Sequence, residues 1–154
     1  MAFIFQKVGR GVNEFFVVAK NGEADARPGG EAMCWDYTTD SNGITVIEPT
    51  TAGLGFFAGV VAHGTTLAKS GADGQYGKLQ VYGHHAGIYM GIAGASAVKG
   101  NPLVPSNLTG SMVVATTHTA STVEACNVHH IFAWAAANAA GSLFTRTAGF
   151  IRAM

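Results

Sequence analysis

Histidine is the residue type with the clearest chemical potential in this chain, because it binds metals and changes charge near neutral pH. Six histidines occur: His63, His84, His85, His118, His129 and His130. Neighbouring side chains of a strand point to opposite faces, so neither adjacent pair can chelate an ion from one side. The sequence contains no His-x-His, Cys-x-x-Cys or His-Glu-x-x-His motif. We predict no metal site, with a site assembled across strands as the alternative. If several histidines line a subunit contact, their protonation at about pH 6 should weaken that contact.

Catalytic motifs are also absent from the sequence. There is no Gly-x-Ser-x-Gly elbow. The carboxylates are Glu14, Glu23, Asp25, Glu31, Asp36, Asp40, Glu48, Asp73 and Glu124. Most fall in predicted turns, where we expect them to be solvated. Residues 53–58 (Gly-Leu-Gly-Phe-Phe-Ala) fit a loose dinucleotide-binding pattern, but they precede a predicted strand, whereas that pattern must follow a strand and open a helix. We therefore predict no enzyme, no catalytic residue and no cofactor.

Charge is scarce along the whole chain. Of 154 residues, nine are Lys or Arg and nine are Asp or Glu, which is 12% of the chain and gives zero net charge. Typical soluble domains carry about 25% charged residues. The basic residues are scattered, so we expect no nucleic-acid partner, which would need a basic stripe. A surface rich in Thr, Ser, Asn and Gly is one interpretation. We favour the other, a surface covered by neighbouring molecules, because low net charge promotes association.

Membrane and secretion signals are not recognisable. No window of 18 apolar residues exists, so we expect no membrane partner. The apolar start of the chain is interrupted at Gln6, Lys7 and Arg10, which argues against a secretory signal. Cys34 and Cys126 are too few for a disulfide framework; we expect two buried thiols, with a single bridge as the alternative. We therefore expect a protein assembled in a bacterial-type cytoplasm.

The elements that must position these residues are strands. The chain has 21 glycines, which punctuate short apolar runs at regular spacing, the pattern of an antiparallel β-barrel or β-sandwich. We predict strands at residues 13–19, 31–37, 44–48, 56–63, 78–83, 88–93 and 111–116. Turns are predicted at residues 27–30 and 40–43, and a polar loop at residues 64–77. The aromatic residues of these strands, Phe56 among them, are expected in the core.

Two segments have more than one interpretation. Residues 123–140 could form a short Ala-rich helix, because Ser121-Thr122-Val123-Glu124 matches a capping box. We favour strands at residues 129–135 and 142–153, because they repeat the strand order of residues 56–83. Residues 1–12 could be an edge strand or an N-terminal arm, ahead of a single β-rich domain at residues 13–154. If they form an arm, Phe3, Ile4, Phe5 and Arg10 are the predicted capsid or subunit contacts.

Several segments resemble one protein family. Residues 28–36 (Pro-Gly-Gly-Glu-Ala-Met-Cys-Trp-Asp), 57–62 (Phe-Ala-Gly-Val-Val-Ala) and 74–83 (Gly-Gln-Tyr-Gly-Lys-Leu-Gln-Val-Tyr-Gly) resemble the capsid decoration, or cement, proteins of tailed bacteriophages. The resemblance covers about residues 27–92, with a weaker similarity at residues 129–152.

The resemblance implies a structural virion protein on the outer capsid surface. Such a protein would bind as a homodimer or homotrimer and cement adjacent copies of the major capsid protein, its expected partner. Another virion part, such as a tail or baseplate β-module, is the first alternative. A carbohydrate-binding β-sandwich is the second, and it would need aromatic side chains exposed together.

Overall fold

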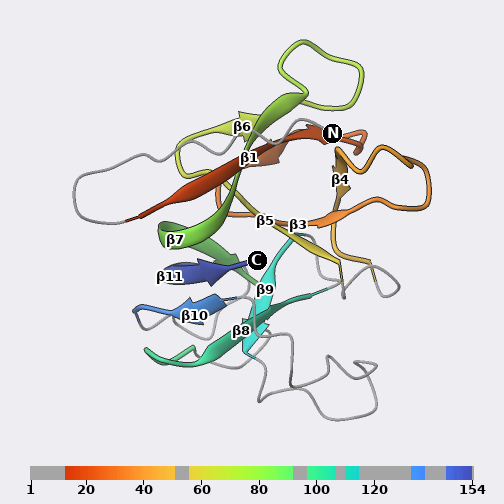
Figure 1. Ribbon diagram of the computed structural model, residues 1–154. Coiled ribbons are helices and arrows are strands. Elements are labelled where there is room, and N and C mark those ends of the chain that lie inside the picture. Colours follow the sequence, from red (N-terminus) through yellow and green to blue (C-terminus); the bar gives the residue numbers. More distant parts are fainter. Residues whose placement is uncertain are drawn as a thin grey trace.

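The chain builds an almost entirely β structure, seen in the computed structural model of Figure 1. The structure describes residues 13–50, 56–91, 97–106, 110–114, 133–137 and 145–153. Within these ranges no residue is helical, and the strands are β1 (Phe15–Asn21), β2 (Arg27–Pro28), β3 (Ala32–Trp35), β4 (Thr45–Ile47), β5 (Phe57–Val61), β6 (Thr66–Leu67), β7 (Tyr76–Met90), β8 (Pro102–Pro105), β9 (Met112–Val114), β10 (Ala133–Ala135) and β11 (Thr145–Arg152). The prediction of a mainly β chain is confirmed.

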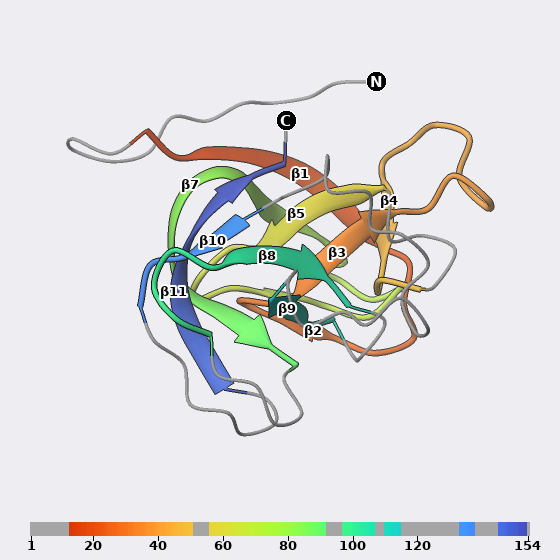
Figure 2. The same ribbon diagram turned by 90° about the horizontal axis from the view of Figure 1, so that it is seen from below.

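Strand β7 organises the sheet. It spans 15 residues and curves strongly through the structure in Figure 2. The sequence predicted two separate strands here, at residues 78–83 and 88–93. The structure joins them, because β11 continues to pair with β7 opposite His84 and His85. The long strand therefore carries the adjacent histidines in its middle.

The strand order makes β7 a shared element. The sheet runs β1-β4-β3-β5-β7-β11-β10-β8-β9, and the additional pairings β1–β7 and β7–β9 return to the same strand. Strand β7 thus belongs to two circuits of paired strands. Most pairings are antiparallel as predicted, but β1–β4 and β7–β9 are parallel. An alternating sequence does not distinguish the two directions, because side chains alternate in both.

Each circuit has its own apolar core. The first core contains Val17, Ala19, Met33, Val46, Ala58, Val61, Leu67, Leu79 and Val81. The second core contains Ala32, Phe57, Val60, Ile88, Met90, Ala97, Leu103, Met112, Val114, Ala133, Ala135 and Ile151. Strand β5 contributes to both, which explains why its residues are all buried; its continuous apolar run is typical of a strand buried on both faces. Burial of each large apolar side chain stabilises the fold by about 1.5–3 kcal/mol.

Short strands also form in segments predicted as turn and loop. Strand β2 lies in the predicted turn at residues 27–30, and β6 lies in the predicted loop at residues 64–77. They pair with each other, Arg27 opposite Leu67. Local sequence did not indicate this pairing, because it depends on contact between distant segments.

The C-terminal part of the chain is strand where the structure describes it. Strand β10 includes Ala133–Ala135, so a helix does not run through these residues of the 123–140 stretch; residues 123–132 and 138–140 lie outside the described residues. In β11, Thr147 and Ile151 are buried while Arg146 and Arg152 are exposed, the alternation of a strand with one buried face. The favoured strand interpretation is confirmed for both described segments.

Candidate interaction surface

Two aromatic rings lie together, exposed, on the surface of the described chain. Tyr37 is 57% exposed and Phe56 is 51% exposed. Their ring centroids lie 5.3 Å apart at an interplanar angle of 76°, an edge-to-face contact. Phe56 was predicted in the core, and this prediction is wrong, because Phe56 precedes β5 and the strand buries Phe57 instead. We call Tyr37 and Phe56 the aromatic patch.

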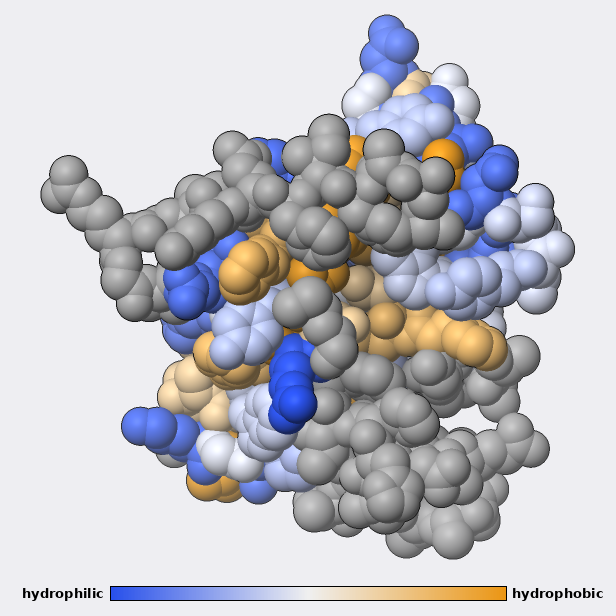
Figure 3. All heavy atoms as spheres, in the orientation of Figure 1, coloured by the Kyte–Doolittle hydropathy of each residue, from blue (hydrophilic) through white to orange (hydrophobic). Residues whose placement is uncertain are grey.

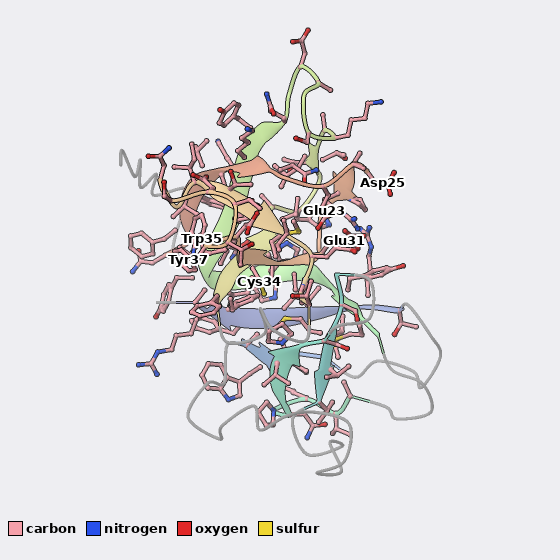
Figure 4. The ribbon with its side chains drawn as sticks, turned by 90° about the vertical axis from the view of Figure 1, so that its right-hand side faces the viewer. Glu23, Asp25, Glu31, Cys34, Trp35 and Tyr37 are labelled. Atoms are coloured by element: carbon pink, nitrogen blue, oxygen red, sulfur yellow. The ribbon has the colours of Figure 1, made fainter. Side chains whose placement is uncertain are left out.

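The aromatic patch is held by the ends of two neighbouring strands. The Trp35 amide donates a hydrogen bond of 2.8 Å to the Phe56 carbonyl, which joins the end of β3 to the residue before β5. Figure 4 shows Trp35 and Tyr37 on one side of the molecule, with Glu23 and Glu31 on the other. Figure 3 shows apolar side chains reaching the surface beside the hydrophilic loops at the upper right of that view. Tyr37 is followed in its loop by the exposed residues Thr38 and Thr39, so the patch adjoins polar side chains.

Asp36 braces the loop that carries Tyr37. Its carboxylate accepts hydrogen bonds from the hydroxyl and amide of Thr38, at 2.7 and 3.0 Å, and from the hydroxyl and amide of Thr39. The side-chain hydrogen bonds from Thr38 and then Thr39 lower the pKa of Asp36. Asp36 is buried, and it lies in the strand predicted at residues 31–37. Its charge is satisfied by its own loop.

Asp40 closes the same loop further along. It accepts hydrogen bonds from the amides of Asn42, Ile44 and Thr45 at 2.8, 3.2 and 2.8 Å. The side-chain hydrogen bond from Thr45 and these backbone amides lower the pKa of Asp40 to about 2. The turn predicted at residues 40–43 is therefore built on this carboxylate. Both loop aspartates are structural, and they orient the loop that carries Tyr37.

Three glutamates converge on one buried arginine. Arg27 forms ion pairs with Glu23 at 3.8 Å and Glu31 at 3.6 Å, and with Glu48 as well. Arg27 and Glu31 are both buried, which places this ion pair in the interior. Desolvation raises the pKa of Glu31, although Arg27 opposes the shift. Glu23 and Glu31 each lie four residues from Arg27 in the sequence, whereas Glu48 reaches the cluster only through the tertiary fold.

The adjacent histidines of β7 point to opposite faces, as predicted. His84 is exposed, and His85 is 1% exposed. His84 and His63 line a groove of about 360 Å³ together with Glu14, Phe16 and Lys78. One lysine and one glutamate give this lining no formal charge, so its charge alone points to no ligand class. Among the described residues, no group of three or more His, Cys, Asp or Glu could hold a metal ion.

The structure describes some of the other residues singled out in the sequence and not the rest. Cys34 is buried, as expected, and Cys126 lies outside the described residues. The predicted contact residues Phe3, Ile4, Phe5 and Arg10 also lie outside them, as do His118, His129 and His130. The sequence analysis did not identify the aromatic patch. The available signal was that Tyr37 and Phe56 stand at the ends of predicted strands, at residues 31–37 and 56–63.

No protein-family model matches the chain, and no curated protein matches it. Within the part of the chain that the structure describes, no helix has the length and apolar character of a membrane span.

Proposed function

We propose that this protein is a capsid decoration protein of a tailed bacteriophage. In this role it binds the outer capsid surface as a homo-oligomer and links adjacent major capsid subunits, without catalysis. The resemblance of residues 27–92 to the cement proteins supports the proposal, and a β-rich fold is compatible with it.

The observation that carries the proposal is the aromatic patch. Tyr37 and Phe56 each expose more than half of their surface in a protein with few charges. Aromatic residues are enriched at protein interfaces, where each ring contributes a large contact area at little entropic cost. A loop braced by Asp36 and Asp40 presents Tyr37 in a fixed position, which reduces the entropy lost on binding. The patch is therefore suited to a partner protein.

The use of the described charges supports the same conclusion. Glu23, Glu31 and Glu48 face Arg27, and the loop aspartates bind their own loop. These charges stabilise the fold and need not be desolvated against a partner. Such a contact would be modest in one copy, but many copies engaging one shell would multiply its effect.

The test mixes the purified protein with DNA-filled heads of the phage that encodes it, prepared without the protein. We expect the protein to co-sediment with the heads at a saturating ratio and to raise the temperature at which they release DNA. A protein that stays in the supernatant and leaves the rupture temperature unchanged would contradict the proposal.

Two further measurements separate the alternatives. Light scattering after size exclusion should report a dimer or trimer, whereas a monomer at high concentration would argue against a cement role. Binding to tails or baseplates in place of heads would identify another virion part. Saturable binding on a glycan array by a protein that ignores heads would identify the carbohydrate-binding alternative, although edge-to-face rings are a poor flat platform for a sugar.

A further inference from the structure

Strand β7 contains a bulge beside the buried histidine. From Thr147 to Gly149, β11 advances two residues, while its partner β7 advances three, from His85 to Ile88. The extra residue on β7 places the side chains of both His85 and Ile88 in the interior. A bulge also removes one amide from the ladder of hydrogen bonds, and that amide needs another acceptor.

His85 supplies this acceptor. The Gly87 amide donates to Nδ1 of His85 at 3.1 Å, and Nε2 of His85 lies 3.0 Å from the Val61 carbonyl. A backbone amide can only donate and a carbonyl can only accept, so the ring must be neutral with its hydrogen on Nε2. The Val61 carbonyl also accepts from the Gly30 amide at 2.8 Å. One imidazole thus joins the β7 bulge to the end of β5.

A protonated His85 does not fit this arrangement. Its Nδ1–H would face the Gly87 amide, donor against donor, and the amide would lose its acceptor. Burial is the main cause that lowers the pKa of His85; the Val61 hydrogen bond opposes the shift, and His63, His84 and Arg146 add to it.

The described charges around the ring offer no compensating anion. His63, in the β5–β6 loop, packs edge-on against His85, with the two ring centroids 5.9 Å apart. His84 is adjacent on β7, and Arg146 approaches from β11. Glu31, which follows Gly30 in the turn between β2 and β3, directs its carboxylate to Arg27. A positive charge on His85 would therefore be repelled from the interior.

We infer that His85 is an acid-sensitive joint between the β7 bulge and the end of β5, which opens when the ring is protonated. Residues on either side of the joint belong to different cores, Val61 to the first and Ile88 to the second. Opening would loosen the connection between the two cores before the whole chain unfolds. The inference does not depend on the proposed function, and its test uses the isolated protein.

The test compares H85Q with H84Q, a matched change at the exposed neighbouring position. Because the folded-state pKa is lowered, the stability that neutral His85 contributes is present above about pH 6.5, the ordinary value for histidine, and falls below it. We expect the unfolding constant of the natural protein and of H84Q to rise by up to about tenfold per pH unit below that point. In H85Q, the part of this rise that comes from protonation of His85 should be absent. An unchanged pH slope in H85Q would overturn the inference.

A second measurement needs no variant, in case H85Q does not fold. Nitrogen-15 NMR of the natural protein should show His85 neutral, with hydrogen on Nε2, at a pH where a free imidazole is largely protonated. Exchange of the Gly87 and Gly30 amides should accelerate as His85 takes up its proton, ahead of amides in the cores. A His85 ring that is protonated while both amides stay protected would refute the joint.

Discussion

Gly30 and Gly87 are in direct backbone contact: a Cβ atom at Gly30 would overlap the carbonyl oxygen of Gly87. Gly30 has a φ of 99°, a conformation that residues with a side chain rarely adopt. The Tyr89 amide donates to the Gly30 carbonyl at 2.8 Å, so the turn between β2 and β3 docks into the β7 bulge. The joint around His85 is therefore closely packed on its turn side.

Replacing Gly30 should disrupt this docking. We expect G30A to lower the free energy of unfolding by about 3 kcal/mol or more, since backbone strain costs about 1–2 kcal/mol and overpacking about 1–3 kcal/mol more. G71A is the matched control, because Gly71 also has positive φ (79°) but has open space around it. G71A should be destabilised only by the backbone strain. Urea denaturation measures both, and equal losses would argue against a close contact at Gly30.

Truncating the aromatic patch should weaken partner binding without destabilising the fold. We expect Y37S and F56S each to reduce affinity for phage heads by about 30-fold, the effect of losing an interface contact worth about 2 kcal/mol. Y76S is the control, because Tyr76 is 53% exposed at the start of β7. Sedimentation binding isotherms give the affinities. If Y76S weakened binding equally, the effect would not be specific to the patch.

Removing Arg27 should be much more harmful than neutralising Glu31. We expect R27M to cost about 3–5 kcal/mol, because it leaves the buried Glu31 carboxylate without a counter-charge. We expect E31Q to stay within about 1 kcal/mol of the natural protein at pH 7, since it also removes the cost of burying a charge.

The raised pKa of Glu31 gives this comparison a pH dependence. A carboxyl with a raised folded-state pKa contributes stability below its ordinary pKa and loses it as pH rises. As pH falls from 7 toward 4.5, the free energy of unfolding of the natural protein should therefore rise relative to that of E31Q. Urea unfolding at each pH measures this difference. A loss in E31Q as large as that in R27M would contradict this account.

The Asp40 carboxylate should make the stability of the fold depend on pH in the acid range. Its folded-state pKa is lowered to about 2, so its contribution is present above the ordinary value of 3.8 and falls as pH drops toward 2. We expect D40N to lack this part of the acid unfolding curve and to expose the Thr45 amide to faster exchange. D73N, a matched change in another loop, should keep both features of the natural protein. An acid curve in D40N that matches the natural one would refute the role of Asp40.

The strands and their faces were predictable from the sequence. The alternation in β7 placed Leu79 and Val81 on one face, and the period of two assigned His84 and His85 to opposite sides. The continuous apolar run of β5 indicated burial on both faces. These properties are local, because the direction of a side chain in a strand depends only on its position along the chain.

The tertiary structure alone decided which distant residues meet. It brought Glu48 to Arg27, set Phe56 against Tyr37 at the surface, and placed Nε2 of His85 against the Val61 carbonyl. Each contact depends on which strands pair and on where a bulge shifts their register. Many pairings satisfy the same alternating pattern, and packing of the whole chain selects among them.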